Sequence, residues 1–153
     1  MEQNIVIGAD HAGFQLKEVV KSFLGEEGLI VKDVGTYSEQ AVDYPDFGSE
    51  VAKAVSTGTF TRGILVCGSG VGMAIVANKF KGIRAAVCLD AETARMSRLH
   101  NNTNILVLAG RKTDPETARL IVKVWLETAF EGGRHQGRLD KIADMETAGG
   151  SAV

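Results

Sequence analysis

Short apolar runs that alternate with helical patterns constrain the fold of this chain more than any other feature. Five runs have the β-branched or aliphatic character of buried strands: NIVIGA at 4–9, LIVKDV at 29–34, GILVCG at 63–68, IRAAVCL at 83–89 and NILVLAG at 104–110. Each precedes a segment with helical spacing or caps, which is typical of a parallel sheet covered by helices. We therefore predict an α/β fold: a Rossmann-like, doubly wound, five-stranded parallel sheet of order 2-1-3-4-5 with helices on both faces.

Two of the helical patterns have clear ends. The first repeats apolar side chains at helical spacing and stops at Gly28; its members are Leu16, Val19, Val20, Phe23 and Leu24. The second opens with Asp114 as the cap and Pro115 as the first helical residue, and we expect it to end near Gly132. Its predicted buried side carries Ile121, Val124, Trp125, Thr128 and Ala129.

Composition limits the class of protein. A chain of 153 residues with 44% hydrophobic residues is expected to form one domain, 1–153, with a flexible tail over about 148–153. A net charge of -2 and a pI near 5.9 argue against nucleic acid or an anionic membrane surface as a partner. The first residues lack a basic signal-peptide region, and no apolar stretch approaches the length of a membrane span, so we expect a cytoplasmic protein.

Two turns at the ends of predicted strands carry the candidate chemistry. In the predicted sheet, the turn after the first strand, GADHAG at 8–13, lies beside the turn after the third strand, CGSGVG at 67–72. Gly68, Gly70 and Gly72 permit positive φ and close backbone approach, so the following amides can converge on an oxyanion or a phosphate. A tight strand-to-helix turn without a ligand is the alternative interpretation.

The residue types in this crevice favour a thiol as the reactive group. Cys67 directly precedes the glycine turn, where free amides at a helix start stabilise a thiolate that can act as base or nucleophile. Cys88 has no such turn after it, so we assign it to packing. His11 follows Asp10 on the same edge, where the pair can bind sugar hydroxyls or phosphate. The cysteines lack CxxC spacing and the three histidines are far apart, so we expect no metal site.

Two other functional classes fit the glycine turn less well. A dinucleotide fingerprint needs a glycine where Met73 stands, and a cysteine phosphatase needs an arginine at the same position. Arg134 and Arg138 are four residues apart, hence on one face if helical, and suit a phosphate. A solvated basic patch is the alternative for this pair, and the same alternative applies to Arg111.

Taken together, these motifs resemble the type B ribose-5-phosphate isomerases, which are grouped with the galactose-6-phosphate and allose-6-phosphate isomerases. The likeness covers nearly the whole chain. It rests on GADHAGFQLK at 8–17, DVGTYS and VDYPDF within 33–47, CGSGVGM at 67–73, ANKF and GIRAAVC within 77–88, SRLHNNTNIL at 97–106 and EGGRHQGR at 131–138.

The resemblance implies a role for each matching residue. Cys67 corresponds to the base that moves a proton between C1 and C2 of an aldose through an enediolate, and His100 to the acid that opens the sugar ring. The backbone amides of Gly68, Gly70, Val71 and Gly72, with the Ser69 hydroxyl, correspond to the oxyanion site. Asp10, His11 and Asn101 correspond to sugar-binding positions, and Arg111, Arg134, His135 and Arg138 to phosphate-binding positions. No metal or organic cofactor is implied.

The resemblance also sets expectations for substrate and assembly. Some family members carry a glutamate base where this chain has Met73, which cannot remove a proton, so the chain is expected to use the cysteine as its base. Many members carry threonine where this chain has Ser69, and serine keeps the hydroxyl. Family members are dimers or larger, so we expect a homodimer or homotetramer in which His100 and Arg111 serve the neighbour's cysteine. The expected reaction interconverts ribose 5-phosphate and ribulose 5-phosphate in the pentose phosphate pathway. One alternative is an isomerase of an aldohexose 6-phosphate such as allose 6-phosphate. A nucleotide-binding module without isomerase activity is the other.

Overall fold

Strands and helices alternate along the chain, as the sequence predicts. The structure, a computed structural model, describes the backbone of residues 4–151 and the side chains of residues 4–148. The strands are β1 (Ile5–Ala9), β2 (Val31–Asp33), β3 (Arg62–Cys67), β4 (Ala85–Val87) and β5 (Ile105–Ala109). The helices are α1 (Phe14–Glu26), α2 (Tyr44–Ser56), α3 (Val71–Ala77), α4 (Ala91–Asn101), α5 (Pro115–Glu127) and α6 (Arg134–Ser151). Each strand falls on one of the five predicted apolar runs.

The five strands form one parallel sheet in the order β2-β1-β3-β5-β4. The predicted order 2-1-3-4-5 is therefore wrong for the last two strands, because β5 pairs with both β3 and β4. Burial explains the difference. Every residue of β5 is fully buried, as an interior strand of a covered sheet must be, whereas the three residues of β4 are only partly buried and suit an edge.

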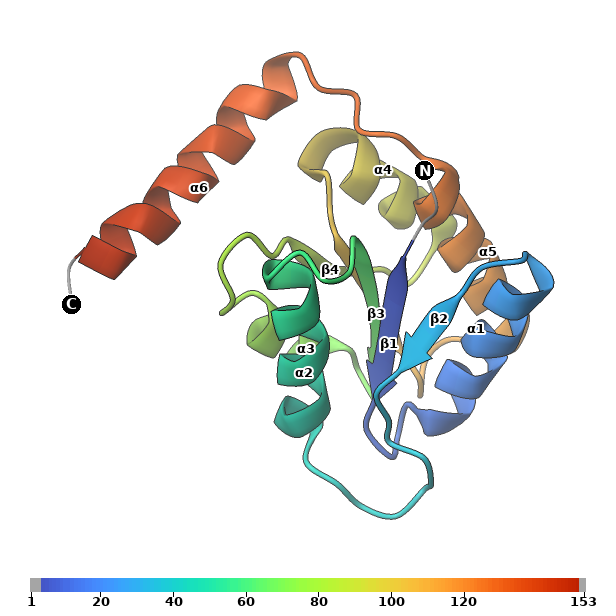
Figure 1. Cartoon of the computed structure of the whole chain (residues 1–153). Helices are drawn as coiled ribbons and strands as arrows, with labels where there is room; N and C mark the ends of the chain where they lie inside the picture. Colours follow the sequence, from blue (N-terminus) through green and yellow to red (C-terminus); the bar gives the residue numbers. More distant parts are fainter. Residues whose placement is uncertain (1–3, 152–153) are drawn as a thin grey trace.

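Helices cover both faces of the sheet, as predicted (Figure 1). Because side chains alternate along a strand, Ile5 and Ile7 point to one face and Val6 to the other. The first face packs against α1, α4 and α5, with Trp125 fully buried among them. The second face packs against α2 and α3. Two apolar layers therefore fix the sheet, and its carboxyl edge is left for the connecting turns.

The ends of α5 show where the sequence prediction holds and where it fails. The helix begins as predicted, with Asp114 Oδ1 accepting the Thr117 N–H at 2.9 Å and Pro115 in the first turn. It ends at Glu127 rather than near Gly132, because Thr128 leaves the helical conformation with ψ 118°. The residues after α5 therefore form an extended connection toward α6.

Helix α6 projects away from the sheet (Figure 1). It begins at Arg134, so the stretch that carries both predicted phosphate-binding arginines is helical. Its backbone is helical to Ser151 and so includes most of the segment predicted to be a flexible tail; residues 152–153 lie outside the described residues. Between residues 4 and 151, no helix combines the length and apolar character that a membrane span requires.

Candidate active site

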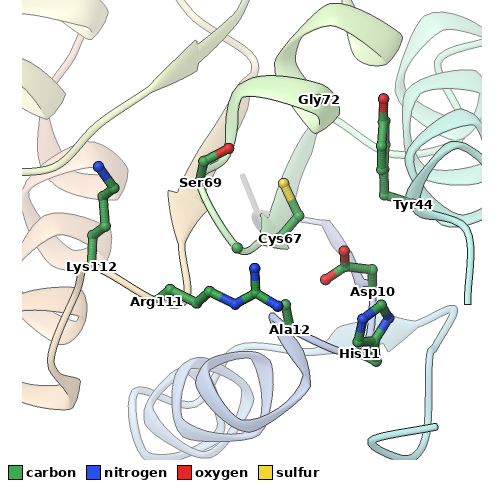
Figure 2. Close-up of a pocket in the computed structure, with 10 residues that line it drawn as sticks. Asp10, His11, Ala12, Tyr44, Cys67, Ser69, Gly72, Arg111 and Lys112 are labelled. Atoms are coloured by element: carbon green, nitrogen blue, oxygen red, sulfur yellow. The ribbon is translucent and has the colours of Figure 1, made fainter. Parts of the chain in front are cut away.

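A pocket of about 430 Å³ opens at the carboxyl edge of the sheet, where β1, β3 and β5 end (Figure 2). Open α/β sheets bind ligands at this edge. We call this site the cysteine pocket; its lining residues are Asp10, His11, Ala12, Tyr44, Cys67, Gly68, Ser69, Gly72, Arg111 and Lys112. The two turns predicted to share a crevice do so, because β1 and β3 are neighbours.

Two glycines allow the turns around the cysteine pocket to pack closely. A Cβ on Gly13 would lie 2.4 Å from the carbonyl oxygen of Val66, and a Cβ on Gly110 would lie 2.7 Å from that of Ala12. A side chain at either position would push the start of α1 away from the neighbouring turns. The Gly110 N–H also donates to the Cys67 carbonyl oxygen at 2.7 Å. These contacts fix the distance between the cysteine and the residues that follow β1 and β5.

Cys67 ends β3 with its sulfur next to a backbone donor. Its side chain lines the pocket, although the residue is only 4% exposed. The Gly70 N–H donates to the sulfur at 3.2 Å. Gly70 has a left-handed backbone with φ 81°, which turns the loop back so that its amide reaches the sulfur. The loop therefore places a backbone N–H donor directly beside the cysteine sulfur at the wall of the pocket.

The other two glycines of the loop provide space. A Cβ on Gly68 would lie 3.1 Å from Arg111 Nη1, and a Cβ on Gly72 would lie 2.7 Å from the ring of Tyr44. Both distances are too short for a side chain unless the neighbour moves. Glycine at these positions therefore lets Arg111 and Tyr44 close around the loop that follows Cys67.

Ser69 and the start of α3 complete the loop. The Ser69 hydroxyl accepts the Val71 N–H at 3.2 Å, while the Val71 side chain is 56% exposed. Because α3 has only seven residues, individual N–H groups rather than a long helix dipole supply the positive charge here. Met73, one turn further, is fully buried in the core below the loop.

Charged groups of both signs face the cysteine pocket. The side chains of Arg111 and Lys112, which follow β5, bring two positive charges, and the backbone N–H of Arg111 donates to the Gly68 carbonyl oxygen at 3.1 Å. The Asp10 carboxylate, buried beside them, accepts the Gly13 N–H at 2.9 Å through Oδ1. Figure 2 shows the Arg111 guanidinium between Ala12 and the loop after β3. Such a pocket suits an anionic ligand that also carries hydroxyl groups.

Sequence reasoning missed three lining residues, Ala12, Tyr44 and Lys112. Each lies next to a predicted feature: Ala12 follows His11, Lys112 follows Arg111, and Tyr44 belongs to the VDYPDF segment named in the resemblance. The tyrosine comes from α2, on the far side of a long connection from β2. Nothing in its local sequence indicates that this helix begins above the glycine loop.

The second cysteine lies in the apolar core, as predicted. Cys88 is fully buried and packs in the same layer as α4 and α5. Burial raises the pKa of its thiol to about 11, and the charge of Asp90 acts in the same direction. At neutral pH this thiol is therefore protonated and lies outside the cysteine pocket.

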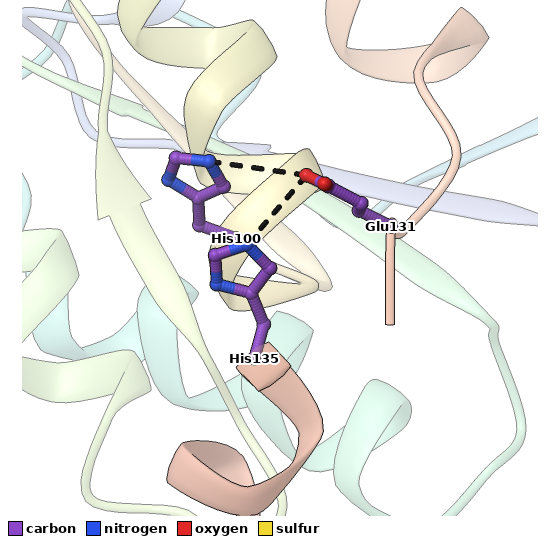
Figure 3. A group of neighbouring side chains, drawn as sticks. All are labelled: His100, Glu131 and His135. Carbon is purple, nitrogen blue, oxygen red and sulfur yellow. Dashed lines mark ion pairs between the residues drawn. The ribbon is translucent and has the colours of Figure 1, made fainter. Parts of the chain in front are cut away.

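A second group of polar side chains joins α4 to the start of α6 (Figure 3). We call His100, Glu131 and His135 the histidine cluster. The imidazole rings of His100 and His135 stack with centroids 4.3 Å apart, and Glu131 Oε2 lies 4.0 Å and 3.5 Å from their respective Nε2 atoms. His135 is buried, and its Nε2 makes no hydrogen bond within the described part of the chain. Burial and the neighbouring charge of His100 lower the pKa of His135.

The residue types of the histidine cluster are those that bind zinc, but their geometry does not suit a metal. The three ligand atoms lie within 4.8 Å of one another. However, the two rings are inclined by only 19°, so their lone pairs lie in nearly parallel planes. A metal ion about 2 Å from both nitrogens would lie well outside the plane of at least one ring. The stacked arrangement instead suits two imidazoles that share one carboxylate.

The predicted site residues therefore fall into two groups. His100, Asn101, Arg134, His135 and Arg138 do not line the cysteine pocket. His100 and Asn101 are the last residues of α4, near the starts of β4 and β5, where Arg84 Nε donates to the Asn102 carbonyl oxygen, and the other three lie at the start of α6. Asn101 lines a separate cavity of about 250 Å³ against α6. Arg111, which was expected to serve a neighbouring subunit, lies beside the cysteine of its own chain.

Comparisons with known proteins agree with this architecture. The family model described as Ribose/Galactose Isomerase matches residues 5–142. Ribose-5-phosphate isomerase B of Escherichia coli is 47% identical over 144 residues, which cover 94% of this chain and 97% of that protein. The structure of Clostridium thermocellum ribose-5-phosphate isomerase B has a TM-score of 0.93 at 49% identity, covering 94% of this chain and 97% of that one.

A further solved structure carries a ligand. Ribose-5-phosphate isomerase B from Mycoplasma genitalium, with bound ribulose-5-phosphate, has a TM-score of 0.92 at 41% identity, covering 96% of this chain and 98% of that one. The family match, the identity over nearly the full length and the shared fold point to one conclusion. The chain belongs to the ribose/galactose isomerase family of sugar-phosphate isomerases, among its type B ribose-5-phosphate isomerases.

Proposed function

We propose that this enzyme interconverts ribose 5-phosphate and ribulose 5-phosphate, with Cys67 as the base. The observation that carries the proposal is the cysteine sulfur at a pocket wall, 3.2 Å from the Gly70 N–H and in the same cavity as Arg111. Relatives with this activity in their names, and one with ribulose-5-phosphate bound, support the choice of substrate. The reaction belongs to the pentose phosphate pathway.

The proton transfer requires one base and a stabilised oxyanion. In the open-chain aldose, the Cys67 thiolate removes the proton bound to C2, and the negative charge passes to O1 as an enediolate. A proton moves from O2 to O1, and the cysteine returns its proton to C1, which gives the ketose. Atoms and charge balance over the cycle. The base and the oxyanion donors each contribute substantially to such a rate.

The loop after β3 supplies the donors for the developing charge. The Gly70 N–H lies 3.2 Å from the sulfur, and the backbone N–H groups from Gly68 to Gly72, with the Ser69 hydroxyl, would stabilise the enediolate oxygen. Asp10 and His11, on the opposite wall, would bind sugar hydroxyls. Arg111 would contribute to phosphate binding in the same chain.

We propose that the histidine cluster completes the site of a second copy of the chain. His100 would act as the ring-opening acid, Asn101 would bind the sugar, and Arg134, His135 and Arg138 would bind the phosphate. These residues lie at the amino edge of the sheet, away from the cysteine pocket of their own chain. Helix α6 projects from the domain with Met145 70% exposed, so it offers apolar surface to a partner (Figure 1). A homodimer, or a tetramer built from such dimers, is the corresponding assembly.

A side-by-side assay tests the substrate. Ribose 5-phosphate should be isomerised with a higher kcat/KM than allose 6-phosphate, and unphosphorylated ribose should be nearly inert. A higher kcat/KM for the six-carbon sugar would instead identify an aldohexose 6-phosphate as the substrate. Saturable nucleotide binding without turnover of any aldose phosphate would contradict the isomerase proposal altogether.

A further inference from the structure

The hydrogen bond between His11 and the backbone of Val42 determines which ring nitrogen carries a proton. The Val42 N–H lies 3.1 Å from His11 Nδ1. A backbone N–H can only donate, so Nδ1 must be an acceptor and cannot be protonated. A neutral imidazole of this kind carries its proton on Nε2. We infer that the connection between β2 and α2, residues 34–43, holds His11 Nδ1 as a hydrogen-bond acceptor, selects the Nε2–H tautomer and so gives the cysteine pocket a fixed hydrogen-bond donor.

The start of this connection is anchored by a buried ion pair. The Lys17 side chain is fully buried, and its Nζ lies 2.6 Å from Asp33 Oδ2. Lys21 Nζ approaches the same oxygen at 2.8 Å, and Asp33 Oδ1 accepts the Gly35 N–H at 2.9 Å. Burial by itself would raise the pKa of Asp33, but the hydrogen bonds from the two lysines outweigh it and lower the pKa. Asp33 therefore remains an anion that fixes the first residues after β2.

Further bonds hold the rest of the connection against β1 and α1. The Thr36 N–H donates to the Ala9 carbonyl oxygen at 2.8 Å, and the Ala9 N–H donates to the Gly35 carbonyl oxygen at 2.8 Å. The Gln15 side chain donates to the Glu39 carboxylate.

The far end of the connection is set by α2. Val42 directly precedes Asp43, the N-cap of that helix, and Tyr44, which lines the cysteine pocket. The donor is therefore held between an anchored loop and a packed helix.

The consequence concerns recognition of the substrate. Within residues 4–151, the Val42 N–H is the one hydrogen-bond partner of His11, so Nε2–H is left for an oxygen of the bound molecule. A proton on both nitrogens would place the Nδ1–H against the Val42 N–H. His11 therefore offers one N–H donor to the pocket, beside the positively charged side chains of Arg111 and Lys112. The assignment of this oxygen to a sugar phosphate rests on the proposed function, whereas the inferred tautomer of His11 is independent of it.

Nitrogen NMR of the full chain labelled with 15N-histidine tests the tautomer without any substrate. In the wild type at neutral pH, the His11 signals should show a protonated Nε2 and an unprotonated Nδ1. A proton on Nδ1, alone or in the imidazolium form, would overturn the inference. Because no turnover is measured, this result is independent of whether the enzyme isomerises ribose 5-phosphate.

A variant pair tests the role of the backbone donor. Val42→Pro removes the N–H, whereas Val42→Ala shortens the side chain and keeps the N–H. We expect a mixture of tautomers and a KM about tenfold higher in Val42→Pro, with wild-type spectra and KM in Val42→Ala. Circular dichroism checks that both variants fold. A Val42→Pro variant that folds and keeps the Nε2–H tautomer alone would refute the role of the loop. If this variant does not fold, the wild-type spectrum alone tests the inferred tautomer of His11.

Discussion

The cysteine pocket and the histidine cluster lie at opposite edges of one sheet and differ in how far a single chain completes them. Around Cys67, the ends of three strands and the start of α2 enclose a cavity with charges of both signs. The histidine cluster instead lies where α4 meets a projecting α6, with Glu131 57% exposed. One chain therefore encloses the cysteine pocket by itself, whereas the histidine cluster lies at a partly open surface. The contrast leads to tests that treat the two regions as halves of one site.

The largest effect should come from the sulfur itself. Cys67→Ala should lower kcat by about 10³-fold or more, because it removes the proposed base and leaves the pocket walls in place. Binding of ribose 5-phosphate, measured by calorimetry, should persist. Cys88→Ala serves as the matched control and should keep wild-type turnover, since that thiol lies in the core. Full activity in Cys67→Ala would remove the cysteine from the mechanism.

Mixing variants tests whether the two regions belong to different subunits. Cys67→Ala and His100→Ala should each be inactive alone. In co-expressed mixed dimers, one of the two sites would regain both groups, so about a quarter of wild-type activity should return for random pairing. Cys67→Ala co-expressed with Asp10→Ala is the control, because both changes affect the same half. Failure of the first pair to regain activity in isolated mixed dimers would contradict the shared site.

The arginines of α6 should affect binding more than chemistry. Replacing Arg134 and Arg138 together with alanine should raise the KM for ribose 5-phosphate about 10- to 100-fold, with a smaller change in kcat. Arg95→Ala is a matched control, because Arg95 is a half-exposed arginine of α4 paired with Glu92. The steady-state parameters of the control should stay within about twofold of wild type. An unchanged KM in the double variant would exclude these arginines from phosphate binding.

The smallest expected effect is a pH dependence of stability confined to the histidine cluster. The pKa of His135 is lowered from its ordinary 6.5 in the folded chain, so the unfolded chain binds a proton there more readily. Its contribution should therefore be constant above pH 6.5 and become destabilising as the pH falls below that value. Thermal unfolding at pH 7 and pH 5 should show a smaller loss of Tm in His135→Asn than in the wild type. An equal loss in both would assign the acid sensitivity to other groups.

Much of the fold follows from local patterns in the sequence. The five apolar runs predict the strands, and the glycine turn predicts the loop that brings the Gly70 amide to Cys67. The crevice between the turns at Asp10 and Cys67 was predictable because the first and third strands are neighbours in this class of sheet. These features depend on residues close together in the chain or on one topological rule.

The remaining features depend on contacts between distant segments. The continuous apolar run of β5 is typical of an interior strand, which is buried on both faces. The order of β4 and β5 nevertheless depends on how the helices pack on the sheet, and β4 is only partly buried. The place of Tyr44 depends on a long connection that crosses β1 and α1. His100 lies far from Cys67 because α4 runs back to the opposite edge of the sheet. The pattern of apolar residues predicts the helix, but it does not indicate whether a second chain brings His100 to a cysteine.

The unequal surroundings of the two thiols make one of them a reporter for ligand binding. Cys88 is sealed in the interior, and its thiol stays protonated at neutral pH. Cys67 can be reached through the cavity that it lines. A small alkylating reagent should therefore modify a single site per chain, and the speed of that modification should fall as the cavity fills. Occupancy by an inhibitor or a slow substrate could then be followed in a protein that is not turning over.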